Sequence, residues 1–290
     1  MDFNAEFKRY YDIAQDIVEQ YKLSGDTEYK KLMDAVNYSY GANGKRIRPV
    51  MLLAACEMAG GNIKDAMPFA AAIEMIHASS LIFDDLPAMD NDDLRRGVPT
   101  NHKVFGEATA ILAGCVLMVR PFEIMSKAAK NQNQIDAISI MAEASGVHGM
   151  MGGQQIDLSY EGKKASKEVI SELNRLKTGA LFKASVVCGA VIAGADKKQL
   201  EAVSEYGDYL GLAFQLIDDL MDNNPDIDTG KTKGSDIENE KSTYLSIYGS
   251  EKCKELASEY TQKAVDALEI FGEKSEFLKQ LVKSLESRIR

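Results

Sequence analysis

Apolar residues recur at spacings of three and four along almost the entire chain, and this pattern limits the possible folds more than any other feature of the sequence. Such spacing is typical of amphipathic helices, whereas strands show sustained alternation, which no segment of this chain has. The sequence therefore predicts an all-α fold. The clearest helical spacing covers residues 50–59, 66–83, 108–119, 135–151, 169–193, 199–221 and the last forty residues, 251–290.

Nothing in the sequence marks a boundary between domains. The chain has 290 residues, enough for a sizeable core, and it contains no Gly/Ser-rich linker and no low-complexity block. Segments 66–83 and 179–193 are apolar on most faces, as expected of central helices that other helices surround. We therefore predict one domain, residues 1–290.

Charge and hydropathy narrow the setting in which the protein works. The net charge of −10 argues against a nucleic-acid-binding surface, which would need a basic patch. The four cysteines lie far apart and form no CxxC pair, which favours a reduced, cytoplasmic setting. The N-terminal stretch lacks the apolar core of a secretory signal, and the longest apolar stretch, 110–119, is too short to cross a bilayer. We expect a soluble protein without a transmembrane segment.

Two clusters of aspartates each follow an apolar helical segment. The first lies in LIFDDLPAMD, residues 81–90, and the second in LIDDLMD, residues 216–222. In the second cluster, Asp218 and Asp222 are four residues apart and therefore share a helix face, with Asp219 beside them. In the first cluster, a helix is expected to end before Pro87. The acidic residues of the first cluster and the loop after it are Asp84, Asp85, Asp90, Asp92 and Asp93.

Paired clusters of this kind favour a site for hard divalent cations. Mg²⁺ takes oxygen ligands, commonly one or two carboxylates together with water and phosphate oxygens. Crowded carboxylates also raise one another's pKa unless a cation relieves their repulsion. A single acidic pair would be interpreted as a solvated surface run, but two clusters after apolar helices indicate metal binding. Neither has the spacing or the closing glutamate of an EF-hand loop.

Four short basic segments accompany the acidic clusters. They are GKRIRP at 44–49, RRG at 95–97, KTG at 177–179 and GKTKG at 230–234. Arginine forms forked hydrogen bonds with phosphate, and lysine supplies a point charge. Any one of these segments alone fits a solvated surface. Together with the acidic clusters, they predict a site for phosphorylated groups.

The series of motifs resembles that of the polyprenyl (isoprenyl) diphosphate synthases. The segments GKRIRP, SLIFDDLPAMDNDDLRRGVPTNHKVFGEA, GQQIDL, KTGALF and GLAFQLIDDLMD, followed by GKTKGSD, occur in the family's order. They are most similar to bacterial-type farnesyl and geranylgeranyl diphosphate synthases. The resemblance implies antiparallel helices around a deep central cavity, usually in a homodimer. It also implies condensation of isopentenyl diphosphate with an allylic diphosphate (dimethylallyl, geranyl or farnesyl).

The resemblance further implies roles for individual residues. The magnesium ligands, for about three ions with substrate bound, are expected to be Asp84, Asp90 and Asp218, supported by Asp85, Asp219 and Asp222. The allylic diphosphate is expected at Arg95, Lys177 and Lys231, which with Asp84 and Asp218 are the candidate catalytic residues. The isopentenyl diphosphate site is expected at Lys45, Arg48, His77 and Arg96, and polar groups near the developing cation at Thr178 and Gln215. His77 precedes Asp84 by two helical turns on the same face.

The implied reaction begins with ionisation of the allylic diphosphate, assisted by the metal ions and cationic side chains. The allylic cation then alkylates isopentenyl diphosphate, and a proton leaves to the released diphosphate, since no side-chain base is evident. Two alternatives stay open. A class I terpene cyclase would not need the isopentenyl diphosphate site, and a catalytically silent regulatory subunit should have lost motif residues that are all present here.

Product length is expected to depend on the helix that leads to Asp84. Ser80 and Ser79 lie four and five residues before it, about one turn or ~5.4 Å, where related farnesyl synthases commonly carry an aromatic residue at the position of Ser79. With two serines the floor should be deeper, near Met75 and Ile76, which favours a geranylgeranyl product or a mixture with farnesyl. Alternatively, the serines merely allow close helix packing, and another helix supplies the floor.

Three departures from the family pattern stand near these positions. Phe83 replaces a usual histidine, Cys115 replaces a usual aspartate, and Arg120-Pro121 interrupts a commonly apolar run. Because proline lacks an N–H and its ring crowds the preceding turn, Pro121 is expected to kink or end its helix. None of the three removes a substrate-binding residue.

Overall fold

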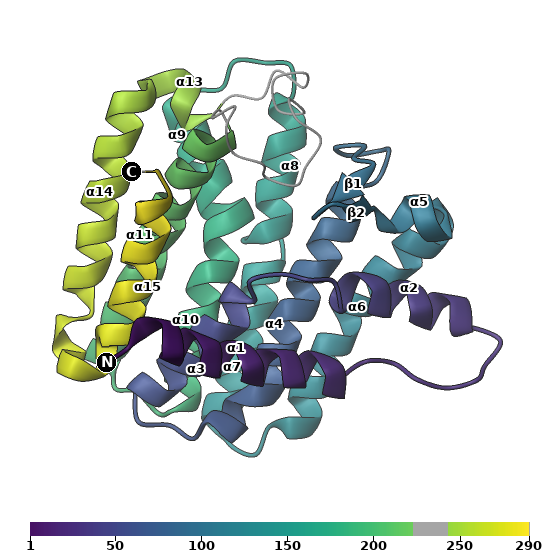
Figure 1. The fold of residues 1–290 in the computed structure, drawn as a ribbon, viewed down its shortest axis with the longest axis horizontal. Helices are drawn as coiled ribbons and strands as arrows, with labels where there is room; N and C mark the ends of the chain where they lie inside the picture. The colour runs from purple at the N-terminus through teal and green to yellow at the C-terminus, as the bar shows by residue number, and fades with distance from the viewer. Residues whose placement is uncertain (223–242, 290) are drawn as a thin grey trace.

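The computed structural model describes residues 1–222 and 243–289, and this part of the chain is helical almost throughout, which confirms the predicted all-α class (Figure 1). The first half contains α1 (Phe3–Gln20), α2 (Lys30–Tyr40), α3 (Ile47–Met58), α4 (Ile63–Asp84), α5 (Asn101–Phe105), α6 (Glu107–Ala128) and α7 (Gln132–Ser145). The second half contains α8 (Met150–Tyr160), α9 (Lys167–Asn174), a π-helix (Arg175–Gly179), α10 (Ala180–Ile192), α11 (Lys197–Asp222), α13 (Tyr244–Tyr248), α14 (Ser250–Ala267) and α15 (Glu276–Glu286). Two 3₁₀ segments, Glu269–Ser275 and Ser287–Ile289, flank α15.

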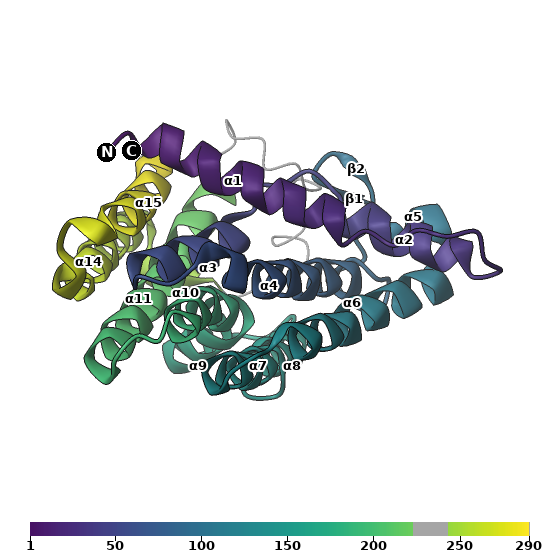
Figure 2. The ribbon, with the colours of Figure 1, turned by 90° about the horizontal axis from the view of Figure 1, so that it is seen from below.

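Helix α4 lies at the centre of the molecule. It packs against α1, α2, α3, α6 and α10, so it is covered on nearly every side. Figure 2 shows α3 and α4 as a middle layer, with α1 and α2 on one side and α7, α8 and α10 on the other. The run of alanines at 70–72 is fully buried there, which explains why this helix is apolar all round rather than on one stripe. A helix held in this way is a rigid support for the aspartate at its C-terminal end.

The C-terminal ends of α4 and α11 lie near one another at the upper end of the molecule in Figure 1. A short antiparallel hairpin, β1 (Leu94–Arg95) and β2 (Val98–Pro99), stands at the same end. The two residues of its turn, Arg96 and Gly97, have positive φ angles of 55° and 77°. Such a turn matches the twist of a hairpin and favours glycine, which explains the glycine after the two arginines.

The structure divides one predicted helical segment and extends another. Residues 135–151 form α7 and the start of α8 rather than one helix, because the backbone leaves the helical conformation at Gly146 (φ −84°, ψ −155°). Pro121 does not end its helix, since α6 continues to Ala128. Pro121 is buried and α6 packs along α4, and this packing offsets the backbone hydrogen bond that the proline removes.

Helices α4 and α6 are both long and apolar enough to cross a membrane, judged by length and composition alone. Helix α6 spans 22 residues, which is longer than the apolar stretch 110–119 that the sequence makes conspicuous. In α4, 67% of the apolar window is buried, as expected for a core helix, whereas in α6 the share is 39%. Helix α6 therefore presents an apolar face that no described residue covers. Its exposed apolar residues are Ile111, Leu112, Cys115 and Val119.

Candidate functional site: a cavity between two aspartate clusters

A cavity of about 970 Å³ opens between α4, α8, the π-helix and α11. It is lined by nearly all of the residues that the sequence singles out. These are Lys45, Arg48, His77, Ser80, Asp84, Asp90, Arg95, Arg96, Lys177, Thr178, Gln215, Asp218, Asp219 and Asp222. Asp85 and Ser79 do not line it, and Lys231 lies outside the described residues.

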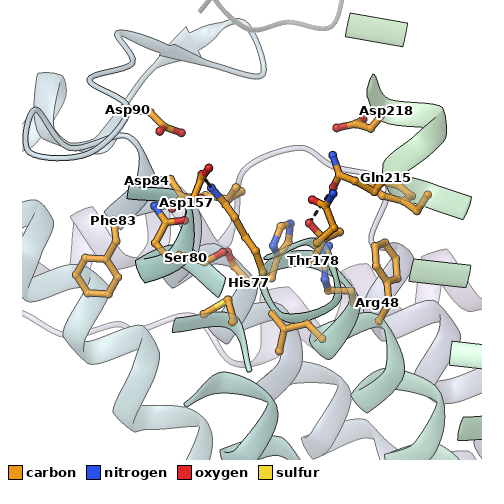
Figure 3. A pocket seen from close by; sticks show the side chains of 18 of the residues that line it. Arg48, His77, Ser80, Phe83, Asp84, Asp90, Asp157, Thr178, Gln215 and Asp218 are labelled. Atoms are coloured by element: carbon orange, nitrogen blue, oxygen red, sulfur yellow. Dashed lines mark hydrogen bonds and ion pairs between the residues drawn. The ribbon is translucent and has the colours of Figure 1, made fainter. Parts of the chain in front are cut away.

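The first acidic wall is built by the end of α4 and the loop that follows. Asp84 is the last residue of α4, and the backbone N–H of Asp90 donates to the Asp84 carbonyl at 2.9 Å. This bond folds the loop back, so that both carboxylates lie on the same side of the cavity, as Figure 3 shows. Asp92 also lines the cavity and was not among the predicted ligands.

Asp85 turns away from the cavity and holds an arginine in place. The Arg95 guanidinium forms an ion pair with Asp85, donating from Nε at 2.8 Å, and a second ion pair with Asp92 at 3.1 Å. Burial raises the pKa of Asp85 to about 6, against the opposing effect of Arg95. Because both carboxylates are nearly buried, Arg95 is fixed at the edge of the cavity with its positive charge facing the acidic wall.

The second acidic wall comes from the last turns of α11. Asp218 faces Asp90 across the cavity in Figure 3. Asp219 accepts hydrogen bonds on both carboxylate oxygens, from Gln215 Nε2 at 2.8 Å and from the backbone N–H of Tyr244 at 2.9 Å. Asp219 therefore ties α11 to α13. All three aspartates, Asp218, Asp219 and Asp222, line the cavity.

The donor set of the two walls suits a hard cation bound together with a phosphorylated ligand. Within residues 1–222 and 243–289, no three carboxylate, imidazole or thiolate groups converge closely enough to form a ready-made metal centre. Oxygen donors nevertheless face one another across the cavity. Since Mg²⁺ is commonly held by one or two carboxylates and completed by phosphate oxygens, walls of this kind fit metal ions that bridge to a diphosphate.

A cluster of basic groups lies deeper, where α3 and α4 approach the cavity. Arg48 Nε and His77 Nδ1 are buried and have no hydrogen-bond partner among the described residues. Burial lowers the pKa of Arg48 to about 10, and the Arg48 guanidinium stacks over the Phe182 ring at 4.4 Å. Burial and the neighbouring arginines lower the pKa of His77 well below its usual range, so the imidazole is neutral at pH 7. Unpartnered buried donors are costly without a ligand, which marks this cluster as a binding site.

Two interactions hold that basic cluster in position. Arg46 forms a buried ion pair with Glu74 at 2.5 Å and donates to Gln15 at 2.8 Å, which ties the start of α3 to α4 and α1. Arg96 donates to the Asn43 carbonyl at 2.7 Å, and its guanidinium lies against Gly44. A Cβ atom at Gly44 would stand 2.4 Å from the Arg96 guanidinium, so only glycine allows this approach.

A third group of polar side chains surrounds the π-helix. Lys177 forms an ion pair with Asp157 of α8 at 2.6 Å. The Thr178 hydroxyl donates to Gln215 Oε1 at 3.1 Å, and Gln215 in turn donates to Asp219. Short π-helical turns often occur at functional sites, and here the turn brings consecutive side chains to the same cavity. The π-helix therefore makes one polar contact with α8, through Lys177, and another with α11, through Thr178.

Much of the remaining lining is apolar. The apolar part comprises Ile47, Leu81, Phe83, Met89, Met118, Met150, Met151, Leu158, Leu173, Leu181, Phe182 and Phe214. Ser80 lines the cavity, and its hydroxyl donates to the His77 carbonyl at 2.8 Å. Ser79 is fully buried and donates to the Gly114 carbonyl of α6 at 2.9 Å, so the predicted position of Ser79 on the cavity wall was wrong.

The predicted floor at Met75 and Ile76 was also wrong. Both side chains are buried in the core and neither lines the cavity. Counting along one helix places residues on faces correctly, but it does not reveal which neighbouring helix covers a given face. Ser79 and Met75 lie on the side of α4 that faces α6.

Several cavity residues were missed by reasoning from the sequence. Asp92 and Asp157 stand within motifs that the sequence makes conspicuous, DNDDLRR and GQQIDL, and these motifs were the available signal. Gln154 belongs to the same GQQIDL motif as Asp157, whereas Glu74 carried no such signal. Gln154 lies on α8 with its buried Oε1 unpartnered among the described residues, and its place in the cavity depends on how α8 packs.

Comparisons with known proteins agree with this geometry. The family model described as polyprenyl synthetase matches residues 29–284. The chain is 42% identical to the farnesyl diphosphate synthase of Micrococcus luteus over 87% of each protein. It is 41% identical to the geranylgeranyl diphosphate synthase of Cyanophora paradoxa, over 91% of this chain and 89% of that protein.

Solved structures are similar over nearly the full length. A farnesyl/geranylfarnesyl diphosphate (FPP/GFPP) synthase from Zymomonas mobilis, in its apo form, has a TM-score of 0.88 and 33% sequence identity, covering 98% of this chain and 99% of that one. A geranyltransferase from Helicobacter pylori, in complex with magnesium and isoprenyl diphosphate, has a TM-score of 0.86 and 26% identity, covering 99% and 97%.

Proposed function

Since this chain belongs to the polyprenyl synthetase family and is a prenyltransferase of the farnesyl and geranylgeranyl diphosphate synthase type, we propose that the cavity between α4 and α11 is where it joins isopentenyl diphosphate to an allylic diphosphate. The observation that carries this proposal is the pair of acidic walls on opposite sides of one cavity, with a separate basic cluster below. One site of this shape suits two diphosphates with different surroundings.

The allylic diphosphate is assigned to the mouth of the cavity. Arg95 and Lys177 both line the cavity that the two acidic walls share, and each is already oriented by a carboxylate. Lys231, which lies outside the described residues, is proposed as a third cation at this diphosphate. These charges stabilise the growing negative charge of the leaving diphosphate, which is where electrostatic catalysis is most effective.

Magnesium is proposed as the metal, with about three ions when substrate is bound. The carboxylates that would hold it are those of Asp84, Asp90 and Asp218, with Asp219 and Asp222 beside them on the second wall, whereas Asp85, which does not line the cavity, supports the site through its ion pair with Arg95. The Helicobacter pylori geranyltransferase, a structural relative, was crystallised with magnesium and isoprenyl diphosphate. When bound, the metal supplies Lewis-acid charge neutralisation at the leaving diphosphate.

Isopentenyl diphosphate is assigned to the basic cluster. Lys45, Arg48, His77 and Arg96 all line that part of the cavity. The Arg48 and His77 donors are buried and unpartnered among the described residues, so a diphosphate there would satisfy them. The neutral imidazole of His77 donates a hydrogen bond without adding another buried charge.

The reaction then proceeds in three steps. The allylic C–O bond breaks and diphosphate leaves with the electron pair. The double bond of isopentenyl diphosphate attacks the allylic carbocation and forms the new C–C bond. The attack leaves a new carbocation on the isopentenyl unit. The released diphosphate takes a proton from the carbon next to this cation, and the remaining electron pair forms the double bond of the product. The Thr178 and Gln215 oxygens face the region of developing positive charge, and the apolar lining excludes water that would quench it.

Two alternatives from the sequence are less well supported. A class I terpene cyclase would have no use for a second, buried basic cluster. A catalytically silent subunit would not need the polar contacts around Arg95, Lys177 and Thr178. Neither alternative explains the conspicuous division of the cavity into an acidic mouth, a basic side and an apolar interior.

We also propose that the enzyme is a soluble, cytoplasmic homodimer and that residues 1–290 form one domain. The exposed apolar face of α6 supports the dimer, since a stripe of four apolar residues on one helix is best stabilised by burial against another surface. Helices from both halves of the chain share one large hydrophobic core, which supports the single domain.

The experiment that tests the function uses the purified full chain with isopentenyl diphosphate, an allylic diphosphate and Mg²⁺. Chromatography of the dephosphorylated products should reveal longer prenyl alcohols, and EDTA should abolish them. A hydrocarbon formed from the allylic diphosphate alone would support the cyclase instead. No diphosphate release with both substrates present would support the silent subunit.

A further inference from the structure

Two relatives of this chain differ in the length of the product that their names give. A farnesyl synthase and a geranylgeranyl synthase are 42% and 41% identical to it, so overall identity does not fix product length. The side chains that line the apolar part of the cavity are the candidates for what decides it. This inference rests on the proposed function, since it concerns where the prenyl tail lies in the same cavity.

One direction inside the cavity is closed. On the side of α10 and α11, the rings of Phe182 and Phe214 are in contact, with centroids 4.7 Å apart. The Arg48 guanidinium lies over the Phe182 ring, 4.4 Å from its centroid. A hydrocarbon tail that passes this side would have to displace a buried cation from an aromatic ring, which is unfavourable. The tail therefore extends toward α6 and α8.

On the α6 side the wall is formed by two side chains. Phe83 of α4 lines the cavity one residue before Asp84, and Figure 3 shows its ring on the side away from Arg48 and Thr178. Met118 is the one residue of α6 that lines the cavity. It follows Gly114 by four residues, so it stands one helical turn along the same face.

Gly114 fixes the position of the Phe83 ring. A Cβ atom at Gly114 would stand 2.6 Å from Phe83 Cζ, which means that the ring is seated directly on the glycine. Ser79, one turn earlier on α4, donates to the Gly114 carbonyl at 2.9 Å and locks the two helices at this crossing. The ring cannot move further toward α6, and any added bulk on α6 would push it into the cavity.

We propose that Phe83 and Met118 together limit product length, with Gly114 setting how far the Phe83 ring withdraws from the cavity. Ser79 then acts on helix packing rather than on the tail. Ser80 lines the cavity near the basic cluster and is not the barrier, because its side chain is too small to stop a growing chain. The phenylalanine ring is rigid, so Phe83 holds a fixed position in the wall. Methionine has more rotatable bonds, so Met118 can adjust its conformation to the end of the prenyl tail.

The test compares product distributions of substitutions with opposite expected effects. Phe83→Ala and Met118→Ala remove bulk and should raise the ratio of longer to shorter products by at least about tenfold, the usual effect of a few methylene groups on pocket discrimination. Gly114→Ala, which pushes the ring inward, and Met118→Phe should lower that ratio. Met125→Ala is the matched control, because Met125 is also buried on α6 and does not line the cavity.

Total incorporation of isopentenyl diphosphate is measured beside the distribution. If the wild-type enzyme incorporates none, the proposed function fails and not this inference. If Phe83→Ala, Met118→Ala and Met118→Phe all turn over substrate and give the wild-type distribution, the inference is overturned. A shift of the same size in Met125→Ala would also overturn it, since the effect would then come from helix packing.

Discussion

At the scale of single residues, the basic cluster shows how much the local backbone contributes to binding. Arg46 and Arg96 both have positive φ angles, 49° and 55°, which are uncommon for residues with side chains. Each is held there by its own partner, Arg46 by Glu74 and Arg96 by the Asn43 carbonyl. The strain is located where two loops must present cations to one diphosphate.

The close approach of Arg96 to Gly44 leads to a specific prediction. Gly44→Ala places a Cβ atom where the guanidinium lies, so Arg96 must move and the KM for isopentenyl diphosphate should rise about tenfold or more, while the KM for the allylic substrate changes little. Steady-state kinetics with each substrate varied in turn measures this.

A double-mutant cycle shows whether Gly44 acts through Arg96. Adding Gly44→Ala to Arg96→Ala should cost little beyond Arg96→Ala alone, since the group that the new methyl displaces is already absent. Fully additive effects on the KM for isopentenyl diphosphate would contradict this explanation.

The buried His77 predicts how stability varies with pH. Its pKa in the folded protein lies well below the unfolded value of 6.5. As the pH falls below 6.5, the unfolded chain binds a proton that the folded protein does not, so the free energy of unfolding should decrease, by up to about 1.4 kcal/mol per pH unit. Asp85 acts in the opposite direction, because its raised pKa stabilises the fold at low pH and this contribution is lost as the pH rises through about 6.

Urea unfolding of the wild type and His77→Gln between pH 5 and 7.5, values chosen around the usual histidine pKa, separates the two effects. As the pH falls, the free energy of unfolding should decrease more for the wild type than for His77→Gln. His148→Gln removes an exposed imidazole and is the control for the loss of a histidine. A difference that does not vary with pH would mean that His77 is protonated alike in both states.

At the scale of helices, the sequence allowed most elements to be located, because apolar spacing depends on the local chain alone. The ends of α4 and α11 were predictable from the aspartate clusters that follow their apolar runs. The orientation of Asp85 and Asp92 was not, because it depends on where the β1–β2 hairpin places Arg95. Ser79 was misplaced for the same kind of reason, since the face it occupies is covered by α6 rather than by the cavity.

The exposed face of α6 predicts the consequence of charging it. Leu112 and Val119 are 55% and 68% exposed, and a glutamate at each should prevent a second copy from burying this face. Sedimentation equilibrium should give the mass of a dimer for the wild type and of a monomer for Leu112→Glu/Val119→Glu. Lys127→Glu, at an exposed position outside the apolar stripe of the same helix, is the control. An unchanged mass for the double variant would place the dimer interface elsewhere.

At the scale of the whole molecule, the helices converge to hold two acidic walls apart across one cavity. The first wall ends a helix that is covered on nearly every side, and the second ends a helix that packs on α10 and α14. Rigid supports matter here, because two carboxylates must keep their separation while unlike ligands enter and leave between them. The sequence predicted both walls and their chemistry, and the family resemblance implied a deep central cavity, whereas the side chains that line this cavity became evident only from the packing of helices that are distant in sequence.

The central claim is that the two walls act together on one diphosphate, and the kcat of matched asparagine variants tests it most directly. Asp84→Asn and Asp218→Asn each remove one charge from one wall with little change in shape, and Asp93→Asn does the same at an exposed aspartate that pairs with Lys103 and does not line the cavity. With both substrates and Mg²⁺ saturating, each wall variant should lose about 10²–10³-fold in kcat, as is typical when a group that stabilises developing charge is removed, and Asp93→Asn should lose little. If one wall variant retained wild-type kcat while the other lost it, the two walls would not share a diphosphate, and the account would be contradicted.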